Sequence, residues 1–389
     1  MSETLTAGKS APAVEIVEPA RAPGGRLVSL DVFRGITVAG MLLVNNPGSW
    51  SAIHPPLRHA EWHGWTPTDL IFPFFLFIVG VAMTFSFAAQ RERGAERSVL
   101  LAKAAKRAAI LVVLGLLLQS YPWIGFDLGH LRIPGVLQRI GVAFLAASAV
   151  VLFTGWRGRL VAMISLLLGY WALMSWVPVP GVGAGVWEPG KDLGAYLDRL
   201  VFGTDHLWRQ AKTWDPEGLL STLPAIATVL FGVFAGDWLR SRRSPAEKLR
   251  LLLIAGAAGI ALGQLWGLAF PINKALWTSS YVVFTAGMAM IGLGLCYWLI
   301  DVKKYQRWGF PFLLFGVNAI TAFFLSGIGA RVITQIHVGD ATLKGWLYNT
   351  LLTPYLAPVN ASLAFALMYV AFWMGMMWVL YRRGIFIKV

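Results

Sequence analysis

Residues 45–80, NNPGSWSAIHPPLRHAEWHGWTPTDLIFPFFLFIVG, join a polar loop to an apolar helical pattern without a break. Residues 45–69 carry three histidines, three tryptophans and several charged residues, and residues 70–80 are entirely apolar. A run of about 20 mainly apolar residues is long enough to cross a bilayer as a helix. Because hydrocarbon tolerates titratable side chains poorly, their concentration at the mouth of a membrane helix indicates chemistry or gating there.

The composition of the whole chain also favours an integral membrane protein. Apolar residues make up 57% of the 389 residues and charged residues only 13%, with 18 tryptophans, which excludes an ordinary soluble domain. We predict an all-α bundle of about ten transmembrane helices, with nine or eleven as the alternatives. The predicted spans lie near residues 27–46, 68–90, 107–120, 134–154, 158–176, 219–239, 251–269, 278–300, 310–330 and 361–381. The third is short unless residues 100–106 extend it as an interfacial turn.

The distribution of Lys and Arg predicts how the bundle is oriented. If the N-terminus is cytoplasmic, the inner segments hold 22 of the 33 Lys and Arg residues and the outer segments hold 9. Short cytoplasmic loops are typically basic, so we expect both termini to be cytoplasmic. The net charge of +14 is then explained by topology, and no basic stripe on a soluble module indicates nucleic-acid binding.

The chain shows one domain and no internal repeat. Residues 1–26 lack an apolar core and are expected to form a disordered cytoplasmic tail, and residues 27–389 a single transmembrane domain. The longest polar segments, 177–218 and 331–360, fall on the predicted outer face. All six histidines also fall in outer segments. The elaborated outer surface indicates that recognition takes place there.

His59 is the best candidate for chemistry in the first loop. His54 and His63 lie four or five residues away, but Pro and Gly residues between and around them disfavour a helical metal site. Cys296 lies in the middle of a predicted span, so no thiolate cluster is expected. A carboxylate at Glu61 or Asp69 could orient one ring nitrogen of His59 and make the other a base. The alternative is that His59 is a solvated loop residue.

Two arginines are predicted inside spans. Arg34 follows Asp31 by three residues, so the two share one helical face and could form an internal ion pair. Alternatively, the Arg34 guanidinium could present a cation to a phosphate. Arg139, preceded by Gln138, would be costly in the membrane unless an anion or carbonyl group meets it.

Polar side chains also mark two later spans. Asn273 and Lys274 precede the eighth span on the outer side, and Asn318 lies within the ninth. An amide in a membrane bundle commonly forms a hydrogen bond to a neighbouring helix, and Asn318 could do so. Alternatively, Asn318 could contact a bound ligand.

Several motifs together resemble one family. SLDVFRGITVAGMLLVNN and RHAEWHGWTPTDLIFPFFLFIVG, followed by LRIPGVLQRIGVAFL, WDPEGLLSTLPAIATVLFGVFAG and PINKALWTSSYVVFTAG, resemble the transmembrane N-acetyltransferases. The lysosomal member of this family acetylates the terminal glucosamine of heparan sulfate. The resemblance runs in order through residues 26–389, and the chain looks like a bacterial NagX-type member.

The resemblance implies acetyl transfer from cytoplasmic acetyl-CoA to the amine of a glucosamine-type sugar on the periplasmic side of a bacterial inner membrane. The family's active histidine corresponds to His59 and its asparagine to Asn45; Asp69 completes the predicted catalytic set as a nearby carboxylate. His63 departs from the lysosomal enzyme, which has Asn there. No metal is expected, and pairing with a second copy of the chain stays open. The expected donor contacts are Arg34, Gln138, Arg139, Asn273, Lys274 and Asn318.

Three further alternatives remain open from the sequence. His59 could accept the acetyl group covalently before passing it on, or act only as a base for direct transfer. An O-acyltransferase could share the same architecture. A polytopic sugar transporter would also account for helices interrupted by Gly and Pro, although the sequence shows no inverted repeat.

Overall fold

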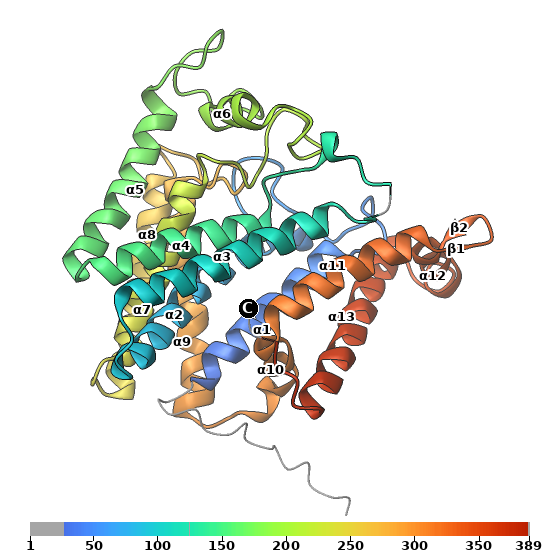
Figure 1. Ribbon diagram of the computed structural model, residues 1–389. Coiled ribbons are helices and arrows are strands. Elements are labelled where there is room, and N and C mark those ends of the chain that lie inside the picture. The colour runs from blue at the N-terminus through green and yellow to red at the C-terminus, as the bar shows by residue number, and fades with distance from the viewer. Residues whose placement is uncertain (1–26, 124, 388–389) are drawn as a thin grey trace, which may run out of the picture.

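The computed structural model describes residues 27–123 and 125–387, and the expected tail at residues 1–26 lies outside them. The described chain is almost entirely helical (Figure 1). The long helices are α1 (Val28–Asn45), α2 (Ile71–Glu92), α3 (Arg97–Gln119), α4 (Val136–Phe153), α5 (Trp156–Trp176), α7 (Thr222–Arg240), α8 (Pro245–Trp266), α9 (Ser279–Cys296), α11 (Ala319–Gln335) and α13 (Pro358–Arg382). The shorter elements are α6 (Leu193–Phe202), α10 (Phe310–Val317), α12 (Leu343–Leu351) and a hairpin of β1 (His337–Val338) and β2 (Ala341–Thr342).

The expected all-α membrane architecture is confirmed, and length and apolar composition identify eight or nine of the expected spans. Among the described residues, eight helices are long and apolar enough to cross a membrane, or nine if the bent pair α10–α11 forms one span. The axes of that pair differ by 73°, with the break at Asn318. The third predicted span, residues 107–120, lies within α3, which is not one of the eight. Its first half carries Lys103, Lys106 and Arg107, and residues 100–106 form regular helix rather than an interfacial turn.

Glycines bring the helices that carry the site into close contact. A Cβ on Gly80 of α2 would lie 1.9 Å from the carbonyl oxygen of Val229 in α7, and one on Gly232 would lie 1.9 Å from that of Phe77. In the same way, a Cβ on Gly316 would lie 1.9 Å from the carbonyl oxygen of Asp31 in α1. Small residues allow helix backbones in a membrane to approach closely. The contacts therefore fix α1 and α2 within the bundle.

The polar loops gather at one end of the bundle. The loop between α1 and α2 lies at the same end as α6 and the segments that flank it (Figure 1). Before α2, a single 3₁₀ turn over Pro67–Leu70 is closed by a capping box between Thr66 and Asp69. A capping box satisfies backbone N–H groups that the first turn leaves unpaired. The box thus fixes the Asp69 side chain where the loop enters the helix.

Candidate active site

His59 and Asp69 form a hydrogen-bonded pair at the loop end of the bundle. Nδ1 of His59 lies 2.6 Å from Oδ1 of Asp69. The carboxylate side chain is only 1% exposed, whereas the imidazole is 48% exposed. If Nδ1 carries the proton and donates it to Asp69, Nε2 is left with a free lone pair. The arrangement suits a base whose orientation is set by a buried acid.

The second oxygen of Asp69 holds the loop that carries His59. Oδ2 accepts hydrogen bonds from the backbone N–H groups of Ala60 and Thr66, each at 3.0 Å, and from the Thr66 hydroxyl at 3.1 Å. The hydroxyl of Tyr281 in α9 donates to the Asp69 carbonyl oxygen at 2.5 Å. Asp69 therefore both orients the imidazole and fixes the backbone on either side of it.

Lys274 reaches the same pair from a distant part of the chain. Its Nζ lies 3.2 Å and 3.3 Å from the two ring nitrogens of His59 and 3.9 Å from Oδ1 of Asp69. Burial lowers the pKa of Lys274, and the charge of Asp69 opposes that shift. The sequence grouped Lys274 with the donor contacts, but the structure places it against the His59 ring.

Asn273 shapes the loop that presents Lys274. Its Oδ1 accepts the backbone N–H of Leu276 at 2.9 Å, and its Nδ2 lies 3.3 Å from Nδ1 of His63. The Asn273 residue is fully buried. Burial also lowers the pKa of His63, which favours a neutral ring there. Asn273 and His63 thus link the two loops, and neither lines the cavity described next.

A cavity of about 440 Å³ opens beside the pair. His59, Asp69 and Lys274 line it together with Asn45, the last residue of α1. The structure thereby brings Asn45 and His59, predicted from separate motifs, to one cavity. The remaining wall combines aromatic, charged and apolar side chains, among them Glu61, Trp62, Arg132, Trp208, Trp214, Glu217, Phe72 and Phe323.

Much of the aromatic and acidic wall comes from the loop between α6 and α7, which the sequence prediction did not assign to the site. Trp214 packs edge-on against Trp62 and Trp208, with ring centroids 5.1 Å and 5.4 Å apart. Arg132 binds Asp215 through Nε at 2.8 Å and Nη2 at 2.6 Å, and Nη2 also contacts Glu217 at 2.5 Å. The acidic and aromatic motif WDPEG at residues 214–218 was the available signal, but only the fold shows which cavity it faces.

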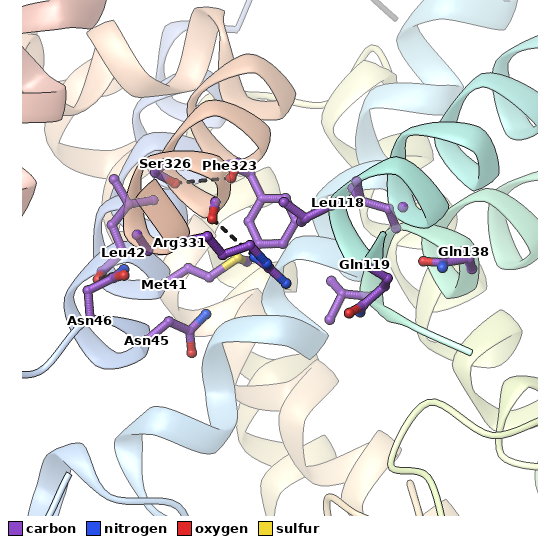
Figure 2. A pocket seen from close by; sticks show the side chains of 15 residues that line it. Met41, Leu42, Asn45, Asn46, Leu118, Gln119, Gln138, Phe323, Ser326 and Arg331 are labelled. Carbon is purple, nitrogen blue, oxygen red and sulfur yellow. Dashed lines mark hydrogen bonds between the residues drawn. The ribbon is translucent and has the colours of Figure 1, made fainter. Parts of the chain in front are cut away.

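Figure 2 shows a second, smaller pocket of about 210 Å³, which shares part of its lining with the first. Met41, Asn45, Val136 and Phe323 line both. Gln138 lines the smaller pocket, and its Nε2 donates to the carbonyl oxygen of Ile133 at 3.1 Å.

Besides Asn273, three more of the residues predicted to contact the donor line neither pocket and bind other parts of the protein. Nη1 of Arg34 lies 3.0 Å from Oδ1 of Asp31 and 3.1 Å from the carbonyl oxygen of Gly316. Arg139 donates to the Gly218 carbonyl oxygen at 3.0 Å and to the Ser221 hydroxyl, and its guanidinium lies 5.1 Å from the centre of the Trp277 ring. Both arginines therefore have partners within the protein: the Asp31 carboxylate for Arg34 and a carbonyl group for Arg139, as the sequence analysis had allowed.

Asn318 also has a structural role, at the break between α10 and α11. Its Nδ2 donates to the carbonyl oxygen of Ile385 at 3.0 Å, and its Oδ1 accepts the N–H of Ile387 at 2.9 Å. The amide therefore ties the helix break to the segment after α13. In residues 27–123 and 125–387, no cluster of three or more His, Cys, Asp or Glu residues could hold a metal ion.

Comparison with known proteins identifies the family. Residues 26–262 match the model described as heparan-alpha-glucosaminide N-acetyltransferase, catalytic. The human heparan-alpha-glucosaminide N-acetyltransferase is 29% identical over 420 residues, which cover 94% of this chain and 60% of the human protein. The mouse protein of the same name is 29% identical over 79% of this chain and 54% of its own length. The chain thus spans a little over half the length of these relatives, and it belongs to the heparan-alpha-glucosaminide N-acetyltransferase catalytic family.

Proposed function

We propose that the protein transfers an acetyl group from acetyl-CoA to the amine of a glucosamine-type sugar. The observation that carries the proposal is the His59–Asp69 pair, which shares one cavity with the Asn45 amide. Membership of the family supports the class of reaction. The pair supplies an oriented base, and the amide supplies a hydrogen-bond donor for a developing oxyanion.

Direct transfer would use these groups in sequence. Nε2 of His59 takes a proton from the acceptor amine, and the nitrogen attacks the thioester carbonyl carbon. The N–H groups of the Asn45 amide stabilise the oxyanion of the tetrahedral intermediate. When the C–S bond breaks, the His59 imidazolium returns its proton to the departing thiolate. Asp69 stabilises the imidazolium throughout without accepting its proton.

The cavity walls suit an amino sugar as acceptor. Trp62, Trp208 and Trp214 offer aromatic faces and edges on which the C–H faces of a pyranose can pack. Glu61 and Glu217 add carboxylates that can accept hydrogen bonds from sugar hydroxyls or from an ammonium group.

We infer that the donor approaches from the opposite end of the bundle. Arg107 of α3 lies close enough to Arg34 of α1 for the two cations to repel one another, and this repulsion would favour an anion bound nearby. Eleven residues of α1 separate Arg34 from Asn45, a rise of about 16 Å along the helix. A donor with its phosphates at these arginines would have to extend its pantetheine arm along α1 toward His59. In this scheme both chain termini and the donor are cytoplasmic, and the acceptor is periplasmic.

The proposal is tested with purified protein reconstituted in liposomes and supplied with acetyl-CoA and glucosamine. Free thiol should be released in proportion to acetylated sugar, and the mass spectrum of the product should place the acetyl group on nitrogen. An ester product would favour the O-acyltransferase. Sugar uptake without consumption of acetyl-CoA would contradict the proposal and favour a transporter.

A single-turnover experiment separates the two routes of transfer. Labelled acetyl-CoA is mixed with the protein without acceptor, and the protein is quenched and digested. Direct transfer predicts no labelled peptide that contains His59. An acetylated imidazole at His59 that disappears on addition of glucosamine would show a covalent route instead.

A further inference from the structure

The smaller pocket differs from the larger cavity in its charge. Its described lining includes no Asp, Glu, His or Lys, and its only charged side chain is Arg331 of α11. Amides and a hydroxyl provide the other polar groups: Asn45, Asn46, Gln119, Gln138 and Ser326. The larger cavity, by contrast, contains both acids and bases. The composition of the smaller pocket therefore favours an anionic group over a cationic one.

Arg331 is partly buried and has a single protein contact that satisfies only part of its guanidinium. Nη1 donates to the Gly327 carbonyl oxygen of its own helix at 3.0 Å. Among the described residues, no carboxylate lies within ion-pair distance of Arg331. Its guanidinium lies between Asn45 and Gln119 (Figure 2). A guanidinium presents a fork of donors that matches the two oxygens of a carboxylate, sulfate or phosphate.

The pocket lies at the level of His59 rather than deeper in the bundle. Asn45 ends α1, Gln119 ends α3, and Val136 begins α4. The pocket also shares the side chains of Met41 and Phe323 with the His59 cavity. If the donor extends along α1 with its phosphates at Arg34, those phosphates lie at the other end of the helix from this pocket. The ligand of the pocket is therefore more consistent with a part of the acceptor.

We propose that the pocket around Arg331 is an acceptor subsite for an oxyanion, a carboxylate, sulfate or phosphate substituent on or next to the amino sugar. Arg331 would bind two of its oxygens, and the amide of Gln119 would donate to a remaining lone pair. The subsite rests on the proposed acetyl transfer and adds its substrate class: anionic amino sugars in preference to neutral ones.

The test compares acceptors in the reconstituted enzyme. The probes are glucosamine, glucosamine 6-phosphate and a glucosamine with a carboxyalkyl ether at O3, each measured by thiol release with wild type and Arg331→Gln. In wild type, at least one anionic sugar should show a KM about tenfold or more below that of glucosamine. Arg331→Gln should remove that advantage and leave kcat, the KM for glucosamine and the KM for acetyl-CoA within about twofold.

Two control variants show whether the preference depends on the Arg331 guanidinium itself. Arg209→Gln removes an exposed cation that donates to the His130 carbonyl oxygen and lines neither pocket, so it should leave the preference intact. Arg331→Lys retains the charge without the fork and should keep part of the preference. The thermal midpoint of each variant in detergent shows whether it is folded.

The possible results point to different conclusions. A KM for anionic sugars that is no lower than that for glucosamine overturns the subsite and leaves acetyl transfer intact. A selective rise in the KM for acetyl-CoA in Arg331→Gln would assign the oxyanion to the donor, and this too would overturn it. If no acceptor releases thiol in wild type, the proposed function fails and the subsite fails with it.

Discussion

The protein contains two His–Asp pairs of nearly identical local geometry in very different surroundings. Nδ1 of His59 lies 2.6 Å from Asp69, and Nδ1 of His130 lies 2.5 Å from Asp127. The two imidazoles are similarly exposed, at 48% and 59%. The carboxylates differ sharply, because Asp69 is 1% exposed and Asp127 is 65% exposed.

The difference shows that a short His–Asp contact alone does not make an active site. Asp127 also accepts the N–H of Gly129 at 2.8 Å, and the hydrogen bond from His130 holds the pKa of Asp127 below its ordinary value. Nevertheless, exposed ion pairs contribute little because water screens them. Asp69 is instead held by Ala60 and Thr66, and its histidine faces a cavity with Asn45 and Lys274.

The largest difference in activity between the two pairs is expected when the aspartate of each is replaced. Asp69→Asn should reduce kcat by a factor on the order of 10² to 10⁴, because an amide stabilises the wrong imidazole tautomer. Asp127→Asn should leave kcat within about twofold, since that pair lies outside both pockets. Steady-state thiol release by the reconstituted variants measures both effects. Equal losses in the two variants would show that burial of the acid does not matter.

The Asn45 amide gives the His59 pair a neighbour that the His130 pair lacks. Asn45→Ala should lower kcat by about 10² to 10³, the range observed when one oxyanion donor is removed. The KM for glucosamine should change little, because the interaction forms mainly in the transition state. If KM rises and kcat is unchanged, Asn45 binds the acceptor rather than the oxyanion.

Lys274 should have a smaller effect. Its ammonium lies beside the His59 ring and adds positive charge where the thioester oxygen becomes negative. Lys274→Met should therefore reduce kcat/KM by about tenfold. Lys191→Met is the matched control, because Lys191 pairs with the exposed Glu188 away from both pockets. A fully active Lys274→Met variant would reduce that lysine to a structural contact.

Asp198 is a buried carboxylate that, unlike Asp69, has no histidine partner in the described part of the chain. Its burial should show in the pH dependence of stability. Burial raises the pKa of Asp198 from 3.8 to about 7, although the N–H of Leu219 donates to it. Between these values the folded chain keeps a proton that the unfolded chain releases, so stability should fall as pH rises through this window. The slope should approach about 1.4 kcal/mol per pH unit.

The measurement is the thermal midpoint of detergent-solubilised protein between about pH 4 and 8, compared with Asp198→Asn. The variant retains a side chain that can accept from Leu219 but cannot ionise, so its midpoint should vary less with pH. Identical pH profiles for variant and wild type would contradict the raised pKa.

The sequence predicted the local part of the site better than the distant part. His59 and Asp69 are ten residues apart in one capped loop, so proximity in sequence was enough to pair them. Lys274 lies 215 residues beyond His59, and no pattern in the chain indicates that their loops meet. The tryptophan wall was missed for the same reason, since it joins the loop before α2 to the loop before α7.

The polar residues within helices were the hardest to interpret. Arg34 and Asn318 look alike in sequence, as isolated polar groups in apolar runs, whether they bind a ligand or the protein. Only the structure shows that Asn318 binds the backbone after α13 and that Arg34 meets Asp31 and Gly316. The break at Asn318 was missed because residues 310–330 are continuously apolar around it, so periodicity gave no sign of a bend.

The most direct test of the central claim is the rate of thiol release by His59→Ala beside that of His130→Ala. Both variants remove an imidazole that contacts an aspartate at nearly the same distance, but only one faces the cavity. We predict that His59→Ala loses turnover by a factor on the order of 10² to 10⁴ while His130→Ala retains the wild-type rate. A folded His59→Ala variant that acetylates glucosamine at the wild-type rate would contradict the account.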